Sequence, residues 1–104
     1  MFILIEHIVL FKFSDRTTEA QKEEAARRLR HLIHELPGII DIQAGQNYST
    51  RSKGYSLGLT VRFPTKADHE HYTPSPEHQA VVSYMKEIGL VDSLAVDFEI
   101  PSEK

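Results

Sequence analysis

The amino-acid sequence predicts a single α+β domain of the ferredoxin-like class, with strands and helices in the order β-α-β-β-α-β and a four-stranded antiparallel sheet. Three observations predict it. Apolar and small polar residues alternate strictly over 55–63, apolar residues recur at helical spacing in two segments, and β-branched and aromatic runs lie near both ends. Right-handed crossovers place both helices on one face of such a sheet. With 104 residues the chain has the usual length of one domain, 1–104.

Four segments have the composition of strands. The first is apolar on both faces in its middle, which is typical of a central strand. The third alternates most clearly and is closed by Pro64, and the fourth places Leu94, Val96, Phe98 and Ile100 on one side. The expected strands cover 3–13, about 39–47, 55–63 and about 91–100.

Two helices are bounded by clear signals. Thr18 and Gln21 form a capping-box pattern at the start of the first helix, and a Pro-Gly pair at 37–38 ends it. Residues 65–73 predict one or two loose helical turns. Ser75 is a suitable N-cap for the second helix, which ends at Gly89. Its expected inner face consists of His78, Val81, Val82 and Met85.

Two helices can cover only one face of the sheet. We expect the other face to be open and to carry Ile8, Leu10 and Ala95, with Asp97 and Glu99 among the polar residues that share it. An open apolar face predicts a partner, although solvation of this face is the alternative.

Composition excludes several functions. The balance of 12 basic and 15 acidic residues, a formal charge of −3, argues against nucleic acid as a partner. No cysteine is present, which excludes disulfides and thiolate chemistry and fits a cytoplasmic protein. The apolar start over 1–5 is too short for a signal peptide or a membrane span, so no membrane association is expected.

The residues that carry these patterns resemble a known family. The segments are His-Ile-Val-Leu-Phe-Lys-Phe at 7–13, Lys-Gly-Tyr-Ser-Leu-Gly-Leu-Thr-Val-Arg-Phe at 53–63, Ser-Pro-Glu-His-Gln-Ala-Val-Val at 75–82 and Val-Asp-Phe at 96–98. In order and spacing they are similar to the stress-responsive dimeric α/β-barrel (Dabb) domains. The resemblance implies a homodimer in which two open sheet faces close into a barrel. It also implies no cofactor, and one branch of the family cyclises polyketides.

His78 is the first candidate for chemistry. Near a helix N-terminus its imidazole would stay neutral, as a general base requires. A structural His bonded to a loop carbonyl is the alternative. The resemblance implies a catalytic role for His78 and for Tyr72, whose hydroxyl could donate to a substrate carbonyl; a Tyr capping the core is the alternative. His7 is a third candidate, although a His on an apolar strand is more often a core residue.

One position departs from the cyclase pattern. Leu57 stands where that branch has a second catalytic His, which indicates an apolar pocket beneath the helices rather than an intact cyclase site. We expect four residues to line this pocket: Leu57, Leu59, Val81 and Val82.

Two histidine groups invite a metal interpretation, His69-Glu70-His71 and His31-x-x-His34. Ligands two residues apart diverge on a helix, and the second group offers only two ligands, so we predict solvated surface and no metal for both.

Three functions follow from these observations. The first is a homodimeric protein of undetermined activity that binds a small apolar molecule or protects under stress. The second is a cofactor-independent cyclase or isomerase with His78 as base. The third is a monooxygenase like others of the wider dimeric-barrel superfamily.

Overall fold

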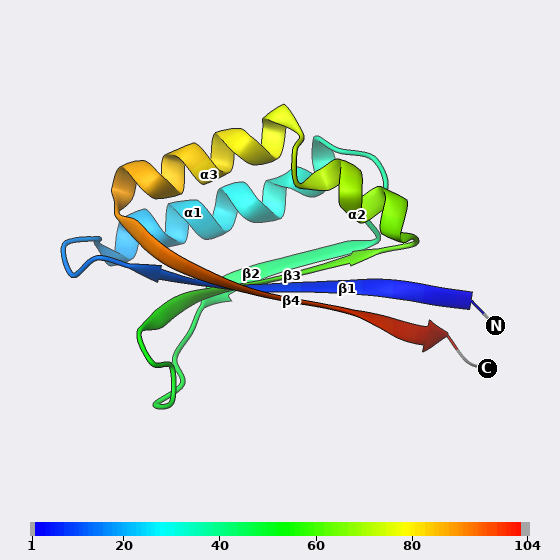
Figure 1. Cartoon of the computed structure of the whole chain (residues 1–104). Helices are drawn as coiled ribbons and strands as arrows, with labels where there is room; N and C mark the ends of the chain where they lie inside the picture. Colours follow the sequence, from blue (N-terminus) through cyan, green and yellow to red (C-terminus); the bar gives the residue numbers. More distant parts are fainter. Residues whose placement is uncertain (1, 103–104) are drawn as a thin grey trace.

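The computed structural model describes residues 2–102, in which a four-stranded sheet is covered on one face by helices (Figure 1). The strands are β1 (Phe2–Phe13), β2 (Asp41–Gln46), β3 (Tyr55–Phe63) and β4 (Leu90–Ser102). The helices are α1 (Glu19–His31), α2 (Lys66–Tyr72) and α3 (Pro76–Ile88), with a 3-10 turn η1 (Leu32–His34) after α1.

The sheet has the order β2-β3-β1-β4, and all neighbouring strands are antiparallel. The predicted ferredoxin-like α+β fold is therefore confirmed, with β1 in the interior of the sheet as its two apolar faces indicated. The loose turns expected over 65–73 are a short third helix, α2. None of the helices within residues 2–102 is long and apolar enough to cross a membrane.

The predicted end of the first helix at 37–38 is wrong, because α1 ends at His31 and the chain tightens into the 3-10 turn η1 before it reaches Pro37. The other predicted helix boundaries follow from local chemistry. Thr18 and Gln21 form the reciprocal capping box of α1, and the Ser75 hydroxyl accepts the His78 N–H at the start of α3. Gly89 ends α3 in the left-handed region, with φ of +120°. A Cβ at this position would lie 2.5 Å from the Thr17 hydroxyl oxygen, so a side chain here would be strained and would also clash.

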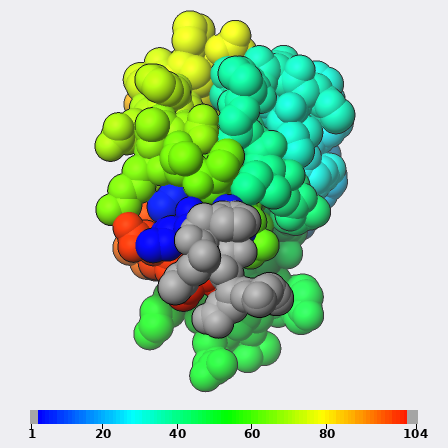
Figure 2. Space-filling view, turned by 90° about the vertical axis from the view of Figure 1, so that its right-hand side faces the viewer, coloured from blue at the N-terminus to red at the C-terminus, as the bar shows by residue number. Residues whose placement is uncertain are grey.

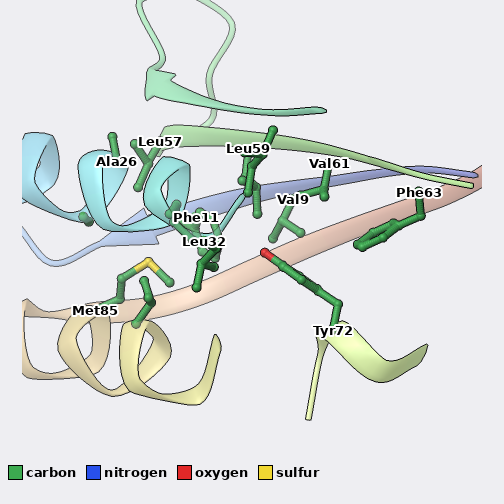
Figure 3. Packing of buried hydrophobic residues seen from close by; sticks show 14 of the residues in the cluster. Val9, Phe11, Ala26, Leu32, Leu57, Leu59, Val61, Phe63, Tyr72 and Met85 are labelled. Atoms are coloured by element: carbon green, nitrogen blue, oxygen red, sulfur yellow. The ribbon is translucent and has the colours of Figure 1, made fainter. Parts of the chain in front are cut away.

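The core lies between the helices and the face of the sheet formed by alternate residues of β1 and β3 (Figure 3). Leu57 and Leu59 of β3 are almost wholly inaccessible, and so are Leu32 and Met85 from the helical layer. We call the part of the layer that contains these four side chains the closed end. Its side chains fill the space between sheet and helices and hold the two layers in a fixed relation.

The faces of β4 are the reverse of the prediction. Ala95 pairs with Val9 and Asp97 pairs with His7, and both β1 residues face the helices. Directly opposed residues of an antiparallel pair share a face, so Ala95, Asp97 and Glu99 lie on the helix side and not on the open side. The alternation of β4 was correct, but its phase was wrong.

The open face consequently has a broader apolar row than expected. Leu94 and Val96 pair with Leu10 and Ile8, and Phe98 pairs with Glu6, whose carboxylate accepts a bond from Arg62 at 2.8 Å. All three β4 side chains are close to half exposed. The loop between β2 and β3 extends beyond the sheet on this same side (Figure 1).

Candidate functional site

The candidate site lies at the opposite end of the helix–sheet layer from the closed end. Here the cover is α2 rather than the longer α1 and α3. Figure 2 views the molecule from this end, with α2 in yellow-green directly above the start of β1 and the end of β4. Two aromatic pairs bring the predicted residues together, His7 with Tyr72 and Tyr72 with His78, and a third pair adds His69 beside His7. We call this part of the layer the polar end.

Tyr72, at the last position of α2, points its hydroxyl into the interior toward Val9 (Figure 3). The side chain is 3% exposed, and its ring packs edge-on against Phe63 at 5.2 Å. Its hydroxyl is buried and has no hydrogen-bond partner among the described residues. Burial raises the pKa of Tyr72 well above its usual value, so the group is a neutral O–H donor.

His78, in the first turn of α3, lies beside Tyr72 with ring centroids 4.6 Å apart. Its Nδ1 lies 2.9 Å from the carbonyl oxygen of Thr73, which can only accept, so Nδ1 carries the proton. Nε2 is then free to accept a proton when the ring is neutral. Burial lowers the pKa of His78, with a smaller contribution from His7, and keeps this neutral form at pH 7. Burial, and not the helix N-terminus invoked from the sequence, is thus the leading cause of the lowered pKa of His78.

His7 is oriented by Asp97, its cross-strand neighbour. The two side chains meet at 2.5 Å between Nδ1 and Oδ1, and because a carboxylate only accepts, Nδ1 donates. When the ring is neutral, the other nitrogen of His7 is an acceptor, the arrangement that a carboxylate gives to a histidine base. His7 is buried whereas the Asp97 side chain is 44% exposed, so the pair spans the edge of the layer.

Asp97 and His69 are the two residues of this cluster that sequence reasoning missed. Asp97 was placed on the wrong face of β4. His69 was assigned to solvated surface, but it is half-buried, with its ring stacked on Phe63 at 5.1 Å and 4.4 Å from His7. Burial lowers its pKa. A signal for His69 was available, because it precedes Tyr72 by three residues and therefore shares its helix face.

The remaining three histidines are exposed: His71 on α2, His31 at the end of α1 and His34 at the end of η1. The His31 and His34 rings lie 5.4 Å apart, and a carboxylate oxygen of Glu35 lies 3.9 Å from Nε2 of His31. Within residues 2–102, the donors that approach one another closely enough to hold a metal ion are those of His7, His69 and Asp97.

The two larger cavities adjoin the layer, besides a small one of about 90 Å³ that is bordered by Leu36, Asp68 and Tyr72. One of about 480 Å³ opens between α2 and β4 and is bordered by His69, Asp97 and Glu99. The other, of about 320 Å³, lies between α1 and α3 and is bordered by Val81. Of the four predicted pocket residues, Leu57 and Leu59 are packed within the closed end, and Val82 is half-buried against it. Their role in a pocket stays a prediction.

Comparison with known proteins places this geometry in a family. A family model described as the stress responsive A/B barrel domain matches residues 5–100. Olivetolic acid cyclase from Cannabis sativa is 30% identical over 76 residues, which cover 71% of this chain and 75% of that protein.

Two solved structures share the whole fold. A dimeric protein of unknown function and ferredoxin-like fold from Bacteroides fragilis is 25% identical, with a TM-score of 0.77 over 93% of this chain and 96% of that one. A dimeric ferredoxin-like protein of unknown function from Thermobifida fusca is 23% identical, with a TM-score of 0.81 over 96% of this chain and 93% of that one. Both similar proteins are described as dimeric.

Proposed function

This chain belongs to the stress responsive A/B barrel domain family, and we propose that it works as a homodimer that binds a small, mostly apolar molecule at the polar end. The ligand presents an oxygen acceptor, such as a carbonyl, to the hydroxyl of Tyr72. Its apolar part lies between α2 and the sheet.

The buried hydroxyl of Tyr72 carries this proposal. A buried hydroxyl without a partner costs about 1–3 kcal/mol, and a ligand acceptor would remove that cost. The surroundings set the rest of the ligand's chemistry, because the hydroxyl points toward Val9 and the Tyr72 ring lies against Phe63. A ligand that reaches this hydroxyl takes the place of apolar side-chain contacts, so the part of the ligand beside them must also be apolar.

The open sheet face supports the homodimer. Its apolar row, Ile8, Leu10, Leu94 and Val96 with Phe98 beside it, is contiguous across two paired strands. Both similar solved proteins are described as dimeric. The β2–β3 loop adds to this, since it projects on the same side and carries Tyr48, which is 99% exposed. A second copy of the chain would cover both features.

A pair of substitutions on neighbouring residues of β4 tests the dimer. Val96→Asp puts a charge into the apolar row, whereas Ala95→Asp puts the same charge on the helix side of the same strand, where Ala95 is exposed. Sedimentation velocity should show a dimer for the wild type and for Ala95→Asp, and a monomer for Val96→Asp. A wild-type monomer at high protein concentration, or dissociation by Ala95→Asp alone, would contradict the proposal.

The two histidines favour a second function, acid–base catalysis without a cofactor. His78 and His7 each donate through Nδ1, to Thr73 and Asp97, so each retains one ring nitrogen as a proton acceptor. Either could remove a proton next to a ligand carbonyl while Tyr72 donates to the developing enolate oxygen. The 30% identity to a cyclase supports this chemistry, and Leu57 in place of that branch's second histidine argues for a different reaction.

Binding is tested with a series of methyl ketones whose alkyl chains increase in length. Wild-type melting temperature should rise with each ketone until the chain fills the site. Tyr72→Phe should abolish this rise, whereas Tyr84→Phe, which removes the hydroxyl of a half-buried tyrosine on α3, should keep it. Equal shifts for wild type and Tyr72→Phe would overturn the binding site.

Catalysis is tested separately by NMR in D₂O. The protein should accelerate exchange of the hydrogens next to the ketone carbonyl, and His78→Gln should slow this exchange at least tenfold while ketone binding persists. Binding without accelerated exchange would leave the binding function and reject the catalytic one.

A further inference from the structure

Three metal-ligating side chains meet at the polar end from three different elements. His7 comes from β1, His69 from α2 and Asp97 from β4, and one donor atom from each lies within 4.8 Å of the other two. The β1–β4 ladder places His7 beside Asp97, and stacking on Phe63 places the His69 ring over β1. The donors are thus held by backbone pairing and ring packing and do not have to be gathered from mobile loops.

The donor set suits a divalent transition-metal ion. Two imidazole nitrogens and one carboxylate oxygen are ligands that zinc takes, at about 2.0–2.2 Å each. Two ligands on one tetrahedral ion then lie about 3.4 Å apart, so the 2.5 Å His7–Asp97 pair must open by about 1 Å. The ion takes the place of the proton between them, which moves to Nε2 of His7 or leaves to solvent.

The surroundings favour a cation and leave it accessible. The cavity of about 480 Å³ is bordered by His69 and Asp97, and it also meets Glu70 and Glu99. Lys66 is the positive side chain at its wall, and its ammonium group is paired with Glu99 at 2.8 Å. Three carboxylates thus surround the opening, and a fourth coordination position would face the cavity, as in zinc sites that bind water or substrate.

From this geometry we infer that His7, His69 and Asp97 form a binding site for one divalent transition-metal ion per chain, with its open coordination position toward the α2–β4 cavity. The inference does not depend on the proposed ligand at Tyr72. An ion held here occupies His7, so in the metal-bound protein His78 is the remaining base next to Tyr72.

The test uses the whole chain, stripped of metal by a chelator, with Zn²⁺ for calorimetry and Co²⁺ as a spectroscopic probe. Wild type should bind one ion per chain and show the intense visible absorption of four-coordinate Co²⁺. His69→Ala removes one ligand and should weaken binding at least 100-fold. His71→Ala is the matched control, because it removes an exposed imidazole from the same helix and should leave binding unchanged.

Further variants decide the other outcomes. Asp97→Asn keeps the shape of the side chain but removes its charge, and should weaken Zn²⁺ binding at least tenfold. Wild-type affinity in His69→Ala, or loss of binding only when His31 and His34 are replaced, would place the ion elsewhere and overturn the inference. Circular dichroism of each variant confirms folding. Tyr72→Phe should bind metal normally, so failure of the ligand proposal and failure of the metal site are distinguishable.

Discussion

The closed end and the polar end are built on the same face of the same two strands, yet they differ in their titratable groups and in the helices that cover them. At the closed end, the row through Leu57 and Phe11 meets Met85 and packs without titratable groups. Two same-face pairs farther toward the start of β1, the row through Val61 and His7 ends at Asp97 and is covered by the short α2. The comparison shows that the longer α1 and α3 cover the packed part of the layer, whereas the short α2 and the first turn of α3 cover the candidate site.

Removal of a side chain from the closed end should have the largest effect. Leu57→Ala leaves a cavity in a fully packed region and should cost about 2–5 kcal/mol in the free energy of unfolding, measured with urea. Val91→Ala, at a position that is 61% exposed on β4, should cost far less. A cost below 1 kcal/mol for Leu57→Ala would mean that Leu57 lines a pocket, as expected from the sequence, and the two ends would differ less than the packing indicates.

At the polar end a truncation should raise the free energy of unfolding instead of lowering it. Tyr72→Phe removes a buried hydroxyl that has no partner, so the unliganded protein should become more stable by about 1 kcal/mol. Thermal unfolding measures the change, and Tyr84→Phe should leave stability within about 0.5 kcal/mol of wild type. A gain in stability together with a loss of ketone binding would identify Tyr72 as a residue kept for function. Destabilisation by Tyr72→Phe would show that its hydroxyl has a partner in the native protein.

The smallest expected effect is a dependence of folding stability on pH, which arises from the histidines of the polar end. The folded pKa of His78 is lowered below its ordinary 6.5, so the unfolded chain binds the proton more tightly. Its contribution to stability is complete above pH 6.5 and is lost as the pH falls through the folded value. His69 acts in the same direction.

Urea unfolding at pH 7.5 and 5.5 measures this dependence. His78→Gln should reduce the loss of stability between the two pH values, whereas Leu57→Ala should lower stability by the same amount at both. An unchanged pH dependence in His78→Gln would show that this ring is solvated when protonated.

The fold was predictable because periodicity and caps are local signals. The alternation in β3 and the capping box at Thr18 and Gln21 depend on neighbours in the sequence, and the structure confirms both. The phase of β4 is not local. Residues 91–99 are exposed on both faces, so the usual rule that the apolar side faces the helices does not hold in this strand.

The candidate site was predictable only in part, for the same reason. His7, Tyr72 and His78 were identified from the sequence, and the structure brings them together. Asp97 was missed because its side depends on the β1–β4 register, a property of two segments 90 residues apart. His69 was missed because its neighbour at 71 is on the exposed side of the same helix, and the two were considered together as one surface group.

The pairing of β1 with β4 also determines the order in which the chain can fold during synthesis. The ladder joins Phe2 to Ser102 and Phe13 to Leu90, so one edge of β1 has no partner until β4 has left the ribosome. Contacts this distant in sequence form slowly, and an unpaired apolar strand is a template for pairing with other chains. A nascent chain stalled before β4 would therefore lack the carboxylate that orients His7 and would carry β1 as an exposed sheet edge, a target for chaperones.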